Sequence, residues 1–181
     1  MLVEVEVQSL GLDRASRSPV VVLRELDGAR VLPIWIGPAE ASAIAMHMAG
    51  MSFPRPLTHD LAVSLVDVLG GRIERMEIHK VEAGTYHAAL VVRVADRLVR
   101  VDARPSDSIA IALRTHATMV VADELLRRMD LELDESEAPP SPDLIEEVDF
   151  TGAEGSPPSS PDDLAAYLRK LDPEDFGRFT P

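Results

Sequence analysis

No cysteine occurs among the 181 residues of this chain. Disulfide bonds, thiolate catalysis and cysteine-ligated zinc are therefore excluded. The chain also lacks an apolar run near the roughly 20 residues that a membrane-spanning helix needs. Its first residues alternate acids with aliphatic side chains, which does not resemble a signal peptide. We therefore expect a cytoplasmic protein with no membrane partner.

Positive charge is scarce in this sequence, and aromatic residues make up only 4% of it. The net charge is −13, but it is unevenly distributed. Residues 1–129 hold 16 Asp and Glu against 15 Lys and Arg, whereas residues 130–181 hold 15 against 3. Because the first part is nearly neutral, its charge neither excludes nor favours nucleic acid as a partner.

The change in composition divides the chain into three parts. Residues 1–129 carry regular apolar periodicity and form the predicted single domain. Residues 130–161 are acidic and rich in proline and serine, which predicts a flexible linker. Residues 162–181 regain a short helical pattern, which predicts an amphipathic C-terminal segment.

Alternating aliphatic residues and turn residues predict seven strands and four helices in the domain. The strands are expected at 3–7, 20–23, 31–36, 72–81, 85–94, 97–103 and 119–121. The helices are expected at 38–49, with Gly37 as its cap, and at 58–69, 106–114 and 123–128. The strands between 72 and 103 are joined by short hairpin turns, which predicts an antiparallel meander. Helices grouped among such strands indicate an α+β fold with a mostly antiparallel or mixed sheet and buried short helices.

The apolar pattern also predicts which way some side chains face. In the helix at 58–69, the residues expected to face the core are Leu61, Leu65, Val66 and Leu69, with Asp60 facing solvent. The only tryptophan, Trp35, lies among aliphatic residues of a strand. It is predicted to belong to the core or to an interface rather than to a stacking platform for bases.

Two short blocks of sequence share one pattern. Arg55-Pro56-Leu57-Thr58-His59-Asp60 and Asp102-Ala103-Arg104-Pro105-Ser106-Asp107 each place an arginine and a proline before a hydroxyl residue, an acid and an apolar helical run. Thr58 and Ser106 are the predicted caps of the two helices. An arginine beside the free N–H groups of a helix start favours binding of an anion.

These residue types suit the cleavage of a phosphodiester, which needs an activated water, charge stabilisation and a proton for the leaving oxygen. Arg55 and Arg104 are predicted to bind the substrate phosphate, since a guanidinium matches two phosphate oxygens. The predicted catalytic residues and the predicted ligands of Mg²⁺ or Mn²⁺ overlap. The catalytic set is His59, Asp60 and Asp107, and the metal set is Asp107, Asp60 and Glu40.

Each of these acids also has a structural interpretation. Glu40, Asp60 and Asp107 all fall in the first turn of a predicted helix, where the helix dipole favours a carboxylate without any chemistry. Asp107 opens a nearly all-apolar helix and therefore needs a partner, for which Arg104 and Arg55 are the candidates. A purely structural Arg/Asp network is the main rival of an active site.

His59 is similarly open to two interpretations. It shares a helical flank with Val63 and Val66, so its ring is expected to lean toward the core and away from Asp60. That position argues against a His59/Asp60 dyad. It favours a hydrogen-bonded packing residue over a base, with both interpretations left open.

Other polar residues are not expected to bind a metal. Asp102 shares a strand face with Arg100 and Arg104, which favours a salt-bridge ladder. The remaining histidines show no ligand spacing and are predicted to be surface or packing residues: His47, His79, His87 and His116.

Together with Pro33-Ile34-Trp35-Ile36-Gly37-Pro38-Ala39-Glu40-Ala41, the two blocks resemble the bifunctional nuclease domain, a family credited with cutting both RNA and DNA. The similarity covers roughly residues 1–128 and is strongest at 32–41, 55–61 and 101–114. It implies a nuclease acting on RNA or DNA. The residues at matching positions are Glu40, Arg55, His59, Asp60, Asp102, Arg104 and Asp107.

Three functions remain open at this point. The first is a metal-assisted nuclease. The second is a non-catalytic regulatory module in which the same Arg/Asp cluster receives a phosphate- or carboxylate-bearing ligand. The third is an assembly role, in which the two small apolar helices pack between subunits and the C-terminal segment docks on a partner. We also expect a homo-oligomer, with a dimer favoured.

Overall fold

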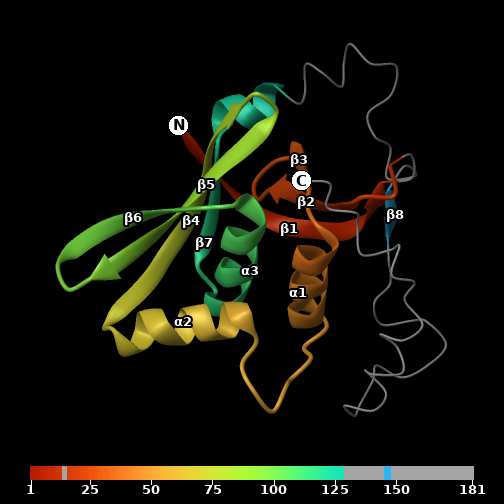
Figure 1. Ribbon diagram of the computed structural model, residues 1–181. Coiled ribbons are helices and arrows are strands. Elements are labelled where there is room, and N and C mark those ends of the chain that lie inside the picture. Colours follow the sequence, from red (N-terminus) through yellow and green to blue (C-terminus); the bar gives the residue numbers. More distant parts are fainter. Residues whose placement is uncertain (14–15, 129–144, 148–181) are drawn as a thin grey trace. The chain divides into compact units, whose positions relative to one another are not determined.

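The computed structural model describes residues 1–13, 16–128 and 145–147. The strands are β1 (Leu2–Asp13), β2 (Pro19–Glu25), β3 (Val31–Trp35), β4 (Gly71–Glu82), β5 (Thr85–Val94), β6 (Arg97–Ala103), β7 (Thr118–Ala122) and β8 (Ile145–Glu147). The helices are α1 (Pro38–Met48), α2 (Thr58–Val68) and α3 (Pro105–Thr115), and residues 123–128 are also helical. The predicted α+β class is confirmed, and every strand and helix predicted between residues 1 and 128 is present (Figure 1).

The strands form one mixed sheet in the order β3-β2-β1-β7-β4-β5-β6, with β8 paired to β1. β4, β5 and β6 form the predicted antiparallel meander, and β1, β2 and β3 form a second one. β7 lies between the two, antiparallel to β1 and parallel to β4. β7 therefore joins two three-stranded meanders that are far apart in the sequence.

β1 is longer than the strand predicted at 3–7. Its pairing with β2 shifts register between Val7 and Ser9, and it continues to pair beyond the shift, with Leu10 opposite Val21. An extra residue in one strand interrupts the two-residue period on which the prediction rested. The second half of β1 was therefore not visible in the pattern.

Three helices pack on the sheet, with α3 between α1 and α2 (Figure 1). α3 contacts α1 and α2 on its sides and β4 and β5 beneath it. It buries Ile109, Ala110, Ile111 and Ala112, while α1 buries Ala41, Ile44 and Ala45. Burial of these small apolar residues inside one chain stabilises the domain. α3 is consequently not available as the surface between subunits that the assembly hypothesis assigned to it.

The helix starts differ from prediction by one or two residues. The N-cap of α2 is Leu57 rather than Thr58, and that of α3 is Arg104 rather than Ser106. Pro105 takes the first position of α3, where its missing N–H costs nothing, and this places the cap at Arg104, two residues before the predicted Ser106. Gly37 caps α1 as predicted.

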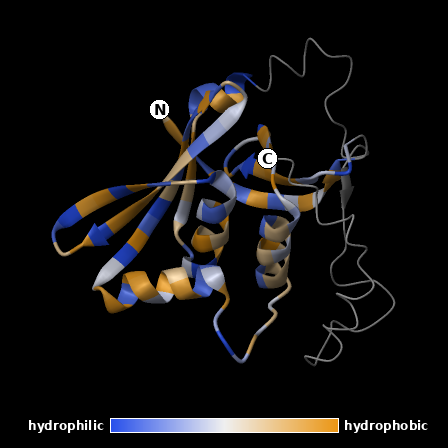
Figure 2. Cartoon of the chain, viewed as in Figure 1, coloured by the Kyte–Doolittle hydropathy of each residue, from blue (hydrophilic) through white to orange (hydrophobic). Residues whose placement is uncertain are grey.

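The predicted inner face of α2 is largely wrong. The helix packs through Ala62, Val63 and Val66, whereas Leu61, Leu65 and Leu69 are exposed, as Val68 also is. In Figure 2 much of α2 has the colour of hydrophobic residues. Apolar residues occupy more than one side of this helix, so periodicity alone could not select the side that meets α3 and β4.

Trp35 is about half exposed, so the core alternative for it is wrong. Its indole Nε1–H donates to Asp13 Oδ2 at 3.2 Å.

Chain contacts divide the protein into residues 1–148 and 149–181. β8 pairs with residues 11–13 of β1, although it falls in the predicted linker. The predicted C-terminal amphipathic segment lies outside the described residues. No helix among residues 1–13, 16–128 and 145–147 has the length and apolarity to cross a membrane.

Candidate functional site

The first turns of three helices meet around one arginine. Glu40 lies in the first turn of α1, His59 in that of α2 and Asp107 in that of α3, which Arg104 caps. The packing of α1 and α2 against α3 brings these side chains together. We call Glu40, His59, Arg104 and Asp107 the Arg104 cluster.

Arg104 is the exposed centre of the cluster. Its Nε–H donates to Asp107 Oδ2 at 2.7 Å, Nη2 donates to Asp107 Oδ1 at 3.1 Å, and Nη1 lies 2.8 Å from Glu40 Oε1. The hydrogen bond with Asp107 raises the pKa of Arg104 above its ordinary value. The side chain remains 64% exposed. A guanidinium has five N–H donors, and the contacts with Asp107 and Glu40 account for three of them.

His59 reaches the same carboxylate from a point 48 residues earlier in the chain. Its Nε2 lies 3.2 Å from Asp107 Oδ1, and the ring is 14% exposed. Burial alone would raise the pKa of Asp107, but hydrogen bonds from Arg104 and His59 outweigh it and hold that pKa below its ordinary value. The predicted core-side placement of His59 is confirmed.

Asp60 belongs to a different pair. Its Oδ1 accepts from Arg114 Nε at 2.6 Å and its Oδ2 accepts from the Leu57 N–H at 2.9 Å. Arg114 also donates to the carbonyl oxygens of Ala110 and Ala43, and its side chain is only 7% exposed. The buried guanidinium of Arg114 therefore links α1, α2 and α3. Because Asp60 pairs with Arg114 and His59 contacts Asp107, the two neighbours do not form a dyad.

Arg114 was not singled out from the sequence. A signal for it exists, because it follows Asp107 by seven residues and is the only other charged residue of α3. Residues seven apart lie on one face of a helix. The two charged side chains of this nearly apolar helix therefore point toward the same neighbour, α2.

The Asp60–Arg114 pair makes stability depend on pH. Burial is the largest single effect and acts to raise the pKa of Asp60, but the hydrogen bonds from Arg114 and from the Leu57 N–H, together with the charge of Arg114, hold that pKa below the ordinary value of 3.8. Stabilisation from a carboxylate of lowered pKa is present above its unfolded pKa and is lost as pH falls through the folded pKa. We expect Asp60→Asn to lower Tm at neutral pH, and the difference from wild type to shrink below about pH 4. A thermal unfolding series over pH measures this, and a Tm difference that does not depend on pH would contradict it.

The three predicted metal ligands do not converge on one point. Glu40 and Asp107 share Arg104, whereas Asp60 binds Arg114. Within the described ranges, no three His, Cys, Asp or Glu residues are grouped so that they could hold a metal ion. Both oxygens of Asp107 already accept hydrogen bonds from Arg104. The residues therefore do not fit a cation held by protein side chains alone.

The structure places the remaining predicted residues outside the cluster. Arg55 lies exposed in the loop between α1 and α2 and has no hydrogen bond or ion pair with another described residue. Arg100 pairs with Glu77 at 3.0 Å instead of with Asp102. Asp102 is exposed and lacks an ion-pair partner in the described part of the chain, so it is not part of the predicted ladder.

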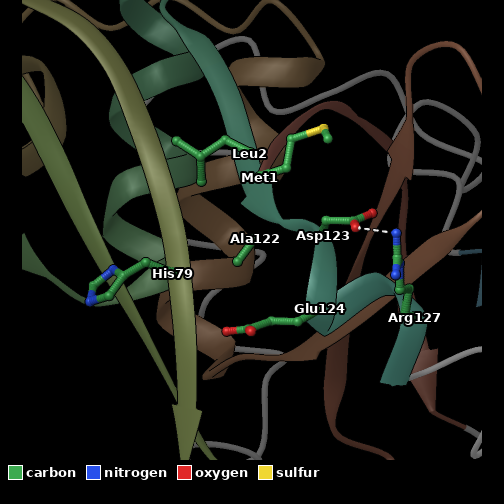
Figure 3. A pocket seen from close by; sticks show the side chains of 7 residues that line it. All are labelled: Met1, Leu2, His79, Ala122, Asp123, Glu124 and Arg127. Atoms are coloured by element: carbon green, nitrogen blue, oxygen red, sulfur yellow. Dashed lines mark ion pairs between the residues drawn. The ribbon is translucent and has the colours of Figure 1, made fainter.

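A cavity of about 410 Å³ lies elsewhere in the domain (Figure 3). Its walls include Met1, Leu2 at the start of β1, His79 of β4 and the side chains of Asp123, Glu124 and Arg127. None of the predicted site residues lines it. The Arg104 cluster is thus a surface site at helix ends rather than the wall of this cavity.

Comparisons with known proteins agree with the family resemblance that the sequence blocks indicated. Residues 21–134 match the bifunctional nuclease domain. The chain is 40% identical over 164 residues to "Uncharacterized protein MT1877" and to "Uncharacterized protein Rv1829", from two strains of Mycobacterium tuberculosis. Each match covers 90% of this chain and 98% of the relative. The chain belongs to the bifunctional nuclease domain family.

Proposed function

We propose that this protein hydrolyses phosphodiester bonds of RNA or DNA at the Arg104 cluster. The observation that carries the proposal is an exposed guanidinium beside a histidine whose ring contacts the same carboxylate. Membership in the nuclease family supports the same reaction. The activity combines phosphate binding with proton transfer.

Arg104 is the proposed phosphate-binding residue. Its Asp107 and Glu40 contacts fix the guanidinium, and its two remaining N–H groups match two phosphate oxygens. A preorganised donor of this kind stabilises charge as it develops on the phosphoryl group. Arg55, which is exposed and unpaired within the described residues, is the proposed second contact for the nucleic acid backbone.

His59 is the proposed proton carrier, and Asp107 positions it. The Asp107 contact occupies Nε2 and thereby holds the ring orientation, while Nδ1 has no partner among the described residues. An imidazole so held can accept a proton from the attacking water or give one to the leaving oxygen. Asp60 has a structural role in this proposal, because both of its oxygens serve Arg114 and the start of α2.

Assistance by Mg²⁺ or Mn²⁺ is a separate proposal, and no step is derived through the ion. Mg²⁺ is commonly bound by one or two carboxylates together with substrate phosphates. Because Arg104 engages Glu40 and Asp107, an ion at this site would have to arrive with the substrate and displace part of that contact. Reactions in Mg²⁺, in Mn²⁺ and in EDTA distinguish assisted from unassisted cleavage.

The test is cleavage of labelled single-stranded RNA and DNA by the purified full chain under those three conditions. Arg104→Ala is expected to lower the initial rate by about 10²–10³-fold, the usual effect of removing one charge-stabilising donor. Arg72→Ala is the matched control, because Arg72 is an exposed arginine on β4 outside the cluster. Equal rates for wild type and Arg104→Ala would contradict the proposal.

A second candidate is a binding module that does not turn over its ligand. It is favoured by one observation, namely that Arg104 is already neutralised by two acids, as in a structural network. Such a module would gain Tm with added nucleotides or phosphate and yield no cleavage product in any of the three conditions. Product formation that depends on Arg104 decides against it.

A further inference from the structure

β6 is an open edge of the sheet. It stands last in the strand order, and among the described strands it pairs with β5 alone. The opposite edge, β3, carries Pro33 in its middle, and proline cannot donate to another strand. β6 has seven residues and contains neither proline nor glycine, so every residue has an N–H and a C=O for pairing, and no described strand occupies its outer side.

β6 exposes apolar side chains on both faces, and one face is mostly apolar, which is unusual for an edge that faces water. Leu98, Val99 and Val101 are each at least 40% exposed. Val99 and Val101 lie opposite Val92 and Leu90 of β5, so they continue the apolar surface of the core side. Figure 2 shows apolar segments on β6 and on α2 at the same side of the domain.

The charges on the other face specify what can pair with this edge. Asp102 has no ion-pair partner in the described part of the chain, and Arg100 is half exposed although it contacts Glu77. A second β6 running antiparallel with Val101 opposite its own copy would place Arg100 opposite Asp102, twice by symmetry. The same register would place Val99 opposite Ala103 on the core side. Directly opposite residues share a face, and opposite charges there are stabilising.

The neighbouring registers are less favourable. Centring the pair on Arg100 would place two arginines directly opposite each other, which is destabilising. Centring it on Val99 would set Arg100 opposite Leu98 and leave Asp102 without a partner. Of these three registers, the one centred on Val101 alone pairs both charges and keeps apolar residues together.

We propose that two copies of this protein dimerise by antiparallel pairing of β6 with β6, in the register centred on Val101. The two sheets then form one continuous sheet across a twofold axis, which is the self-complementary arrangement of a closed dimer. This surface differs from the helices α1 and α3 that the sequence suggested. It makes no use of the proposed cleavage reaction.

The experiment measures the mass of the full chain and its charge variants by light scattering after size exclusion. Wild type is expected at twice the chain mass of 19.7 kDa. Asp102→Arg sets two arginines against each other at both ends of the pairing and is expected to halve the measured mass. Asp96→Arg, which makes the same charge change in the β5–β6 turn, is the control and is expected to leave the dimer intact.

A mixture provides the sharper test of register. Arg100→Asp alone is also expected to be monomeric, with Arg75 still holding Glu77. When Arg100→Asp chains are mixed with Asp102→Arg chains, each arginine meets an acid again, and the dimer mass should return. A monomeric wild type, a dimer that survives Asp102→Arg, or a mixture that stays monomeric would each overturn the proposal.

Discussion

His59→Ala is expected to lower the rate of phosphodiester cleavage by about 10²–10⁴-fold, the range for loss of a general acid or base. The reason is that His59 is the histidine of the Arg104 cluster, and its contact with Asp107 orients the ring. Affinity for nucleic acid should change little, because Arg104 and its acids remain. Single-turnover cleavage and filter binding separate the two effects.

A matched control is His87→Ala. His87 lies on β5, outside the cluster, and the nearest charge to it is Glu82 at 3.9 Å. Its rate should equal that of wild type. Asp107→Asn should retain part of the activity and displace the pH profile of cleavage, since Asp107 acts through His59. A His59→Ala enzyme as fast as His87→Ala would remove His59 from the reaction.

The second large effect concerns stability. Arg114→Met is expected to lower the free energy of unfolding by about 3 kcal/mol, the lower end for breaking a buried ion pair. The lower end applies because Asp60 is still 38% exposed and can regain water. The Ala43 carbonyl on α1 and the Asp60 carboxylate on α2 would both lose the hydrogen bond that Arg114 donates.

Arg127→Met is the control for this measurement. Arg127 also pairs with an aspartate, Asp123 at 2.8 Å, but its side chain is 70% exposed. Exposed pairs four residues apart contribute about 0.3–0.5 kcal/mol, so the variant should unfold almost as wild type does. Urea titration of full chains gives both values. If the two variants differed by less than 1 kcal/mol, Arg114 would not be the tie between the helices.

The two predictions are connected through α2. Arg114 pairs with Asp60, and the residue before Asp60, His59, contacts Asp107. If Arg114 positions α2, then Arg114→Met should also slow cleavage at temperatures where the protein remains folded. A slow but fully folded variant would show that the Asp60–Arg114 pair supports the contact between His59 and Asp107.

The sequence alone was sufficient for much of the fold. Apolar alternation and turn residues located every strand and helix between residues 1 and 128, because those signals are local. It was also sufficient to predict that Asp107 needs a guanidinium partner, since an acid at the start of an apolar helix is costly unpaired. The bulge in β1 and the exposed leucines of α2 were not predictable in this way. Bulges break the period, and a helix with apolar residues on several sides does not reveal which side is covered.

What the sequence determined by itself was which residues could matter: Glu40, His59, Arg104 and Asp107 were all candidates before any coordinates. Only the tertiary structure decided which of them meet. Packing of α1 and α2 on α3 joined Glu40 and His59 to Arg104 and Asp107, and it gave Asp60 to Arg114 while leaving Arg55 apart. The physical reason is that helix and strand formation follows from neighbouring residues, whereas the choice of an ion-pair partner depends on how separate elements pack.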